Sequence, residues 1–120
     1  YTGNPLACAA ACASLELIQN SEFRIQNLVS WQTEFVELLK SNKKIENVRQ
    51  TGTIVAFDVK TDANSDYFNN IRDFLYDNFL KRGVLLRPLG NTVYVLPPYI
   101  ITKEQLQKVY DVIDEVLEIL

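Results

Sequence analysis

The residue that most strongly suggests binding chemistry is Arg87, which follows the apolar run Val84–Leu86 and directly precedes Pro88. A guanidinium offers parallel N–H donors that match a carboxylate, so an arginine at a strand end can hold and orient one. Tyr94 lies across the hairpin predicted for this region and could contact the same ligand. Composition alone favours plainer roles, with Arg87 paired to a surface acid and Tyr94 an interior ring with a solvated hydroxyl.

A second candidate is the chain start, where Gly3 and Asn4 precede a helix expected to begin at Pro5. Asn can cap the free N–H groups of the first turn, and Pro lacks the N–H that would go unpaired there. Such helix ends attract phosphate through their free N–H groups and the helix dipole. Because every helix has this feature, an ordinary capped helix is the plain alternative.

Covalent and metal chemistry has few candidates. The sequence has no His and two Cys, so a zinc site lacks its usual ligands. Most lysines stand beside other charged residues, as in Lys43–Lys44 and Lys103–Glu104, which is typical of solvated lysines rather than of a Schiff-base lysine. Cys8 and Cys12 lie in an Ala-rich stretch and are expected to be small, buried packing residues. Without reference to a known protein family, the residues predict only an α+β domain and no particular chemistry.

The composition predicts one globular domain with a single core, since 48% of the 120 residues are hydrophobic and 22% are charged. The net charge of -3 argues against nucleic acid or an anionic membrane as partners. No apolar run reaches the roughly 18 residues of a membrane span. We therefore expect a cytoplasmic protein.

Two helices are expected in the first part of the chain. The first begins at Pro5 and continues until Asn20–Ser21 breaks its pattern, and its Ala7–Ala13 stretch has no polar face, so it needs a neighbour on most sides. The second is amphipathic, with apolar residues at helical spacing from Ile25 to Leu39.

Strands and further helices follow. Thr53–Val59, with a possible strand before it, is a β-branched and aromatic run. The turn-rich segment 61–65 leads to a third helix with apolar positions from Phe68 to Phe79, closed by Gly83. The predicted hairpin joins strands Val84–Arg87 and Thr92–Leu96 through Pro88, Leu89, Gly90 and Asn91.

The final helix is marked by Thr102 and Gln105, which have the spacing of a capping box, and by an apolar stripe that continues to Leu120. The order predicts an α+β fold, with two N-terminal helices and then a small, mostly antiparallel sheet of three or four strands. Helices should cover one face of that sheet.

Two stretches resemble the class III aminotransferases, which have fold type I, an α/β fold in family terms. Residues 1–9, YTGNPLACA, resemble the segment that opens the C-terminal part of these enzymes, and residues 83–102 resemble the corresponding hairpin of a member in biotin biosynthesis. The resemblance covers essentially the whole chain. It implies that residues 1–120 are the C-terminal small domain of a longer enzyme, with 1–20 the helix that joins it to the large domain.

The resemblance implies a homodimeric pyridoxal-phosphate enzyme that transfers the amino group of S-adenosylmethionine to 8-amino-7-oxononanoate, giving 7,8-diaminononanoate. Arg87 matches the arginine that binds the substrate carboxylate, and Tyr94 matches a tyrosine lining the same pocket. Tyr1 and Thr2 follow the position that reaches the cofactor phosphate of the neighbouring subunit. The Schiff-base lysine is expected in the large domain, so this chain alone should neither bind the cofactor nor catalyse the reaction.

Two alternatives remain open. One is the small domain of an omega-amino-acid or diamine transaminase, although Tyr94 and the run Pro97–Ile101 favour the biotin-pathway member. The other is a non-catalytic α+β dimerisation or binding module, which the composition permits. The apolar first helix argues against such a module, because an independent domain would have to cover that helix itself.

Overall fold

The computed structural model describes residues 2–60 and 71–120 of the chain. Over these residues the elements are α1 (Pro5–Gln19), α2 (Glu22–Leu39), β1 (Ile45–Thr51), β2 (Ile54–Val59), α3 (Ile71–Lys81), β3 (Thr92–Val95) and α4 (Lys103–Glu118). The expected α+β class is confirmed. The turn expected at 61–65 and the expected helix position Phe68 lie outside the described residues.

The sheet is antiparallel with the order β1-β2-β3. β1 and β2 form a tight hairpin in which Thr51 pairs with Ile54, and Gly52 has the positive φ of 56° that this turn requires. β2 pairs with β3 from Val55 opposite Val95 to Asp58 opposite Thr92. The expectation of a small, mostly antiparallel sheet is therefore confirmed.

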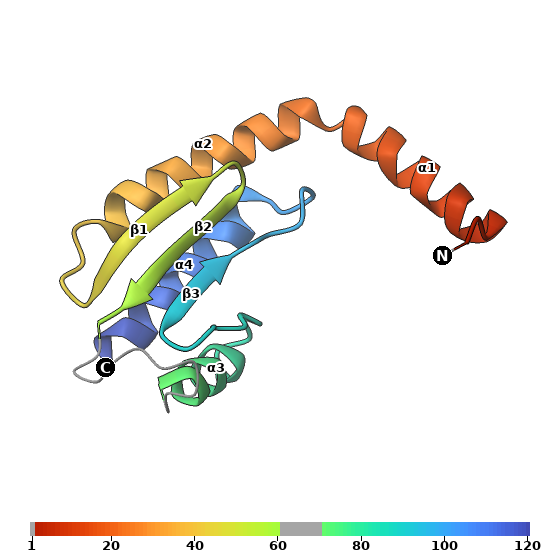
Figure 1. Ribbon diagram of the computed structural model, residues 1–120. Helices are drawn as coiled ribbons and strands as arrows, with labels where there is room; N and C mark the ends of the chain where they lie inside the picture. Colours follow the sequence, from red (N-terminus) through yellow and green to blue (C-terminus); the bar gives the residue numbers. More distant parts are fainter. Residues whose placement is uncertain (1, 61–70) are drawn as a thin grey trace.

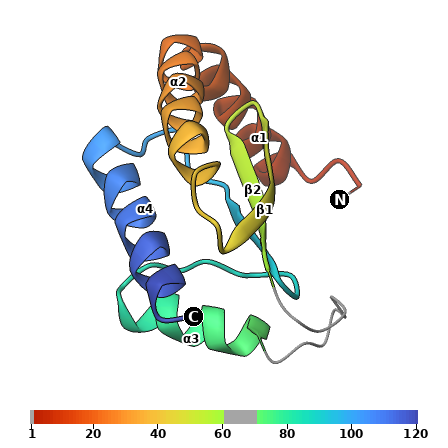
Figure 2. The same cartoon turned by 90° about the vertical axis from the view of Figure 1, so that its left-hand side faces the viewer.

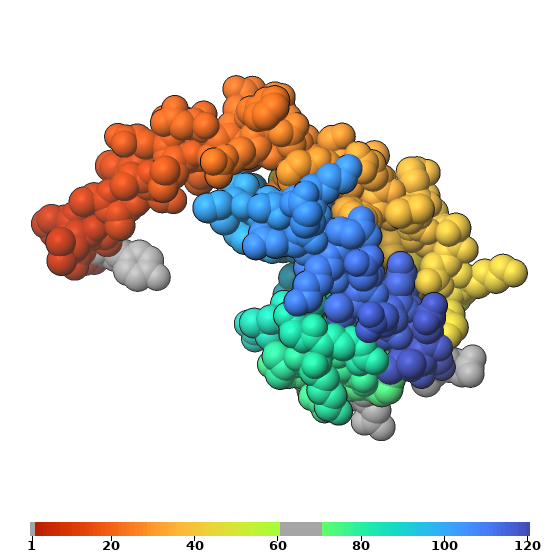
Figure 3. Space-filling model, turned by 180° about the vertical axis from the view of Figure 1, so that it is seen from behind, coloured from red at the N-terminus to blue at the C-terminus, as the bar shows by residue number. Residues whose placement is uncertain are grey.

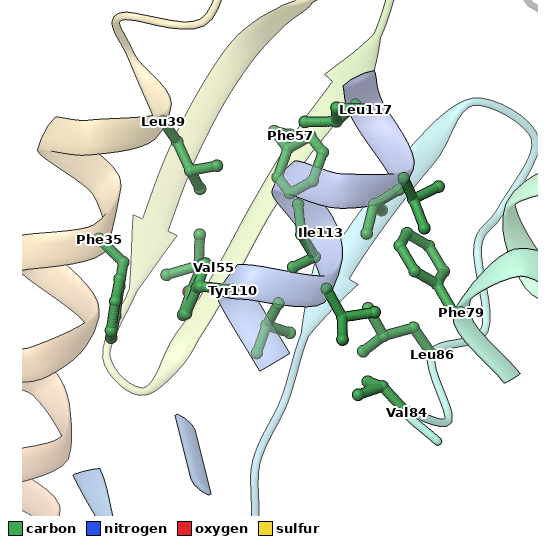
Figure 4. Packing of buried hydrophobic residues seen from close by; sticks show 14 of the residues in the cluster. Phe35, Leu39, Val55, Phe57, Phe79, Val84, Leu86, Tyr110, Ile113 and Leu117 are labelled. Carbon is green, nitrogen blue, oxygen red and sulfur yellow. The ribbon is translucent and has the colours of Figure 1, made fainter. Parts of the chain in front are cut away.

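One face of the sheet forms the core. Alternate β2 residues Val55, Phe57 and Val59 are buried, as are Val93 and Val95 of β3. Helices α2 and α4 lie side by side over this face, while α3 lies at the end of the sheet against α4 (Figures 1 and 2). The close-up in Figure 4 shows Val55 and Phe57 of β2 among core side chains of the helices, including Phe35 and Ile113. The other face of the sheet is not covered by any described helix.

The final helix has the start that the sequence predicts. The Thr102 hydroxyl accepts a hydrogen bond from the Gln105 backbone N–H (3.2 Å), and the Gln105 side chain accepts one from the Thr102 N–H (3.0 Å). This capping box satisfies two N–H groups at the helix end. The apolar stripe of α4 buries Leu106, Tyr110, Val112, Ile113, Val116 and Leu117.

A buried polar contact joins three elements of the core. Gln32 of α2 is 0% exposed, and its side-chain nitrogen donates to the Thr53 carbonyl in the β1–β2 turn at 2.9 Å. The Tyr110 hydroxyl of α4 donates to the Gln32 carbonyl oxygen, and the Tyr110 ring stacks on Phe35 with centroids 4.0 Å apart. This contact holds α2, the hairpin turn and α4 together, because a buried amide without partners would be unfavourable.

Helix α1 lies apart from this body. Its side-chain cap is present, since the Asn4 Oδ1 accepts from the N–H groups of Leu6 (3.0 Å) and Ala7 (3.3 Å). None of the residues of α1 is buried, and the helix projects away from the sheet and its helices (Figure 3). The expected burial of Cys8 and Cys12 is therefore wrong for this chain, because α1 has no described neighbour along its length that would cover them.

Candidate functional site

Arg87 stands in an extended segment between α3 and β3. Alternate side chains of this segment, Val84, Leu86 and Pro88, are buried, so Arg87 lies exposed between two anchored neighbours. Gly83 has a φ of 76° and ends the helical turn after α3, and the Val84 N–H then donates to the Phe79 carbonyl at 3.1 Å. Burial and this bond fix the backbone from which the guanidinium extends.

The expected strand Val84–Arg87 is wrong. This segment makes one isolated bridge with β3, in which Leu89 and Thr92 exchange two backbone hydrogen bonds of 2.9 and 3.0 Å around Gly90 and Asn91. The predicted tight turn is therefore present, but strand pairing between this segment and β3 does not continue beyond the Leu89–Thr92 bridge. The segment is instead held at the end of α3 and by the burial of Val84, Leu86 and Pro88, none of which requires it to follow the edge of β3.

The turn at Gly90 and Asn91 is attached to the end of β2. The Val59 N–H donates to the Asn91 carbonyl, and the Asn91 side-chain nitrogen donates to the Val59 carbonyl, both at 2.9 Å. The Thr92 hydroxyl donates to the Asp58 carboxylate at 2.8 Å. Asn91 in the turn and Thr92 at the start of β3 are therefore bonded to two consecutive residues of β2, Val59 and Asp58.

Asp58 is the centre of a polar cluster on the sheet face away from the helices. Its carboxylate accepts bonds from Asn47 (3.0 Å) and from two nitrogens of Arg49 (3.2 and 3.3 Å) in addition to Thr92. Partial burial alone would raise the pKa of Asp58, but the hydrogen bonds from Thr92, Asn47 and Arg49 outweigh it and lower the pKa. The carboxylate is therefore held in its charged form.

Tyr94 belongs to the same face of the sheet as Asp58. It pairs with Ala56 in the β2–β3 ladder and is half-buried, while its neighbours Val93 and Val95 point into the core. Arg87 has no hydrogen bond or ion pair with another residue of the described ranges 2–60 and 71–120. The pairing with a surface acid that composition favours is thus not made within this part of the chain.

Arg87 is exposed, and Tyr94 is half-buried on the face of the sheet that no described helix covers. A nearby hollow of about 520 Å³ is lined by apolar residues of segments 83–86 and 95–98 and by Lys108 of α4, and neither Arg87 nor Tyr94 contributes to it. Both site residues lie instead on open surface. A closed ligand site would therefore need a further wall beyond the described residues.

Of the two residues expected near the cofactor phosphate, the structure describes one. Tyr1 lies outside the described residues, and Thr2 is exposed in a turn with a φ of 47° before α1. Every lysine of the chain is exposed, which is not the desolvated setting that a Schiff-base lysine needs. The chain's own residues thus do not fit covalent attachment of pyridoxal phosphate. The described residues also contain no group of His, Cys, Asp and Glu that could hold a metal ion.

Two residues near the candidate site were not identified from the sequence. Asn91 has the residue type of a turn, but nothing local shows that its side chain binds Val59. Asp58 lies at an outward position of the alternating strand β2, where an acidic residue is ordinary, so the strand pattern gave no signal that its side chain has partners. Its partner Thr92 is far away in sequence, so only the register of the sheet reveals the pair.

No described helix has the combination of length and apolar composition that crossing a membrane would require.

Comparison with known proteins identifies the family. The family described as Aminotransferase class-III matches residues 1–117. The adenosylmethionine-8-amino-7-oxononanoate aminotransferase of Synechococcus elongatus is 43% identical over 118 residues, covering 98% of this chain and 28% of that protein. The enzyme of the same name from Helicobacter pylori is 32% identical over 124 residues, with the same coverage of 98% and 28%.

A solved structure agrees with this similarity. The adenosylmethionine-8-amino-7-oxononanoate aminotransferase of Methanocaldococcus jannaschii is 27% identical and superposes with a TM-score of 0.79 over 94% of this chain and 28% of that one. The chain thus spans about 28% of the length of the relatives it matches.

Proposed function

The chain belongs to the class III aminotransferases, and on this premise we propose that it is the C-terminal small domain of a pyridoxal-phosphate-dependent transaminase. The proposed reaction transfers the amino group of S-adenosylmethionine to 8-amino-7-oxononanoate and gives 7,8-diaminononanoate for biotin synthesis. The similarity to enzymes of that name over 98% of the chain supports this substrate pair.

We propose that Arg87 binds the carboxylate of 8-amino-7-oxononanoate. The observation that carries this role is that Arg87 is exposed, has no partner among the described residues, and extends from a fixed backbone between buried Leu86 and Pro88. Its guanidinium can donate two parallel hydrogen bonds to one carboxylate, which fixes the orientation of the substrate as well as its position.

Tyr94 is proposed to line the same pocket. Its place on β3 is fixed by the ladder with Ala56, and its half-buried ring on the open sheet face offers an apolar surface with a polar tip. That combination suits a substrate with a hydrocarbon chain that ends in a carboxylate. The missing wall of this site would come from the large domain or the second subunit.

When bound, pyridoxal phosphate supplies the amino-transfer chemistry. The residues of this chain contribute recognition of the substrate, and the exposed lysines support placing the covalent attachment in the large domain. Tyr1, which lies outside the described residues, and Thr2 are proposed only to flank the contact to the cofactor phosphate. We expect this chain alone to bind no cofactor. When pyridoxal phosphate is added to it, the absorbance spectrum should therefore give no sign of attachment to one particular lysine.

The partners proposed for the chain are the large domain of the same polypeptide and a second subunit of a homodimer, in the cytoplasm. The uncovered α1 supports the first of these, because its apolar side chains Leu6, Leu15 and Leu17 are exposed and a neighbouring domain would shield them. Segment 1–20 is then the connection between the two domains.

An assay of the full-length transaminase tests this proposal. With S-adenosylmethionine as donor and 8-amino-7-oxononanoate as acceptor, mass spectrometry should detect 7,8-diaminononanoate. An omega-amino acid and a diamine, offered as donors with pyruvate as acceptor, should react far more slowly. Fast turnover of those pairs with no diaminononanoate formed would instead support the omega-amino-acid or diamine transaminase.

A further inference from the structure

The backbone around Arg87 is not held by a continuous ladder. The only pairing between this segment and β3 in the described residues is the bridge between Leu89 and Thr92. Arg87, which precedes Leu89, is therefore not fixed opposite Tyr94 by regular strand pairing. The position of the guanidinium relative to the sheet therefore depends on two anchors, the buried neighbours Leu86 and Pro88 and the turn with its attachment to β2.

Backbone pairing and side chains together provide that attachment, since the β2–β3 ladder ends at Asp58 opposite Thr92. Asn91 and Val59 exchange two hydrogen bonds of 2.9 Å, one from the Val59 N–H to the Asn91 carbonyl and one from the Asn91 side chain to the Val59 carbonyl. Because this pair uses both polar groups of the Val59 backbone, it fixes the distance and the orientation of the turn against β2.

The bond from Thr92 to Asp58 is the second attachment. The Thr92 hydroxyl donates to Asp58 at 2.8 Å, and Thr92 also closes the turn with Leu89 through two backbone bonds. Asp58 is itself held by Arg49 and Asn47 of β1, so its carboxylate has little freedom to follow a moving turn. A bond to a charged acceptor is stronger than one between neutral groups.

We propose that Asn91 and Asp58 are positioning residues, which hold the Leu89–Thr92 turn against β2 and thereby place the Arg87 guanidinium for a substrate carboxylate. This inference rests on the proposed role of Arg87 as the carboxylate-binding residue. Asn91 acts through Val59, and Asp58 acts through Thr92. Neither residue contacts the substrate. Their loss should shift the guanidinium and weaken recognition of the carboxylate without affecting the amino-transfer step.

The test compares substrates with and without the carboxylate charge. In the full-length transaminase, kcat/KM is measured for 8-amino-7-oxononanoate and for its methyl ester, and their ratio reports recognition of the carboxylate. Thr92→Val removes the hydroxyl while keeping the shape of the side chain, and Asn91→Ala removes the side-chain donor. Each should lower the ratio about tenfold through a higher KM for the acid, with kcat nearly unchanged.

Matched variants separate positioning from a general loss of stability. Thr92→Ser keeps the hydroxyl and should retain the wild-type ratio. Val116→Ala, in the core of α4, should lower the melting temperature but leave the ratio unchanged. If Val116→Ala lowers the ratio as much as Thr92→Val does, or if Thr92→Ser fails to retain it, the positioning role is wrong.

Arg87→Ala separates this inference from the function on which it rests. If Arg87→Ala keeps the wild-type ratio, Arg87 does not bind the carboxylate and both proposals fail. If Arg87→Ala abolishes the preference for the acid while Thr92→Val and Asn91→Ala keep it, Arg87 binds the carboxylate as proposed. The proposed positioning role of Asn91 and Asp58 is then wrong. Loss of the preference in all three variants, with its retention in Thr92→Ser, is the result we expect.

Discussion

Helices α1 and α4 differ in what surrounds them rather than in how they begin. They have 15 and 16 residues, and each starts with a side-chain cap, from Asn4 in α1 and from Thr102 in α4. Yet α4 buries six residues against the sheet, whereas α1 buries none. A cap and good helix formers thus suffice to start a helix, but only a matching neighbour makes it part of a core.

This difference divides the chain into a body and an extension. The body comprises the sheet with α2, α3 and α4, and it carries the turn next to Arg87. The extension is α1, whose Leu17 is 70% exposed while Ile113 of α4 is 0% exposed. The body therefore has the packing needed to position Arg87 by itself, and α1 offers a surface to another domain.

The largest expected effect comes from shortening a core side chain of the body. Ile113→Ala should reduce the free energy of unfolding by about 2–5 kcal/mol, because it removes buried methyl groups and leaves a cavity. The matched change Leu17→Ala in α1 should alter it by less than about 0.5 kcal/mol. Urea denaturation of this chain measures both, and equal effects would show that α1 is packed in solution.

The buried polar contact of the body should give the next largest effect. Tyr110→Phe leaves the Gln32 carbonyl oxygen without its donor inside the core, so we expect a loss of about 1–3 kcal/mol. Tyr76→Phe on α3 serves as the control, since Tyr76 is half-buried and its hydroxyl has no bond to a described residue. A loss for Tyr110→Phe no larger than that of the control would contradict the role of this contact.

A pH dependence should accompany that contact. Burial raises the pKa of Tyr110 above its ordinary value of 10.0. In the unfolded chain this tyrosine ionises from about pH 10, whereas in the folded protein it stays protonated. Stability is therefore complete below pH 10 and falls as the pH rises above it, by about 1.4 kcal/mol per pH unit at most.

Denaturation curves between pH 8 and about pH 11 test this dependence. The wild-type protein should lose more stability over that range than Tyr110→Phe does. Parallel losses in the two proteins would mean that the hydroxyl is accessible to solvent.

The smallest expected effects concern the two helix caps. Thr102→Ala should lower the free energy of unfolding by about 1 kcal/mol, because α4 unfolds together with the body. Asn4→Ala should leave that free energy unchanged and only increase amide hydrogen exchange in the first turn of α1. Should both variants shift the denaturation midpoint equally, α1 and the body would form one cooperative unit.

Much of the body could be predicted from the sequence because its signals are local. Thr102 and Gln105 mark the start of α4, Gly83 marks the turn after α3, and the β-branched run to Val59 marks β2. Each depends on residues a few positions apart. The burial of Cys8 and Cys12 was mispredicted, because it depends on a neighbour that the described chain does not contain.

The candidate site was predictable in its residues and less so in its geometry. The apolar run before Arg87 indicated an extended segment, and the turn-forming residues Gly90 and Asn91 indicated a tight turn. Neither showed that pairing with β3 is limited to the bridge at Leu89. The bond between Asp58 and Thr92 depends on how β2 and β3 pair, and no local pattern contains that information.

The measurement that most directly tests the role of the chain is the KM of the full-length transaminase for 8-amino-7-oxononanoate in wild type and Arg87→Ala. We expect Arg87→Ala to raise this KM on the order of tenfold or more, because the substrate loses its charged hydrogen bonds, while the KM for S-adenosylmethionine stays the same. Arg87→Lys, which keeps the charge but not the paired donors, should fall between the two. An unchanged KM for 8-amino-7-oxononanoate in Arg87→Ala would contradict the proposed function of this surface.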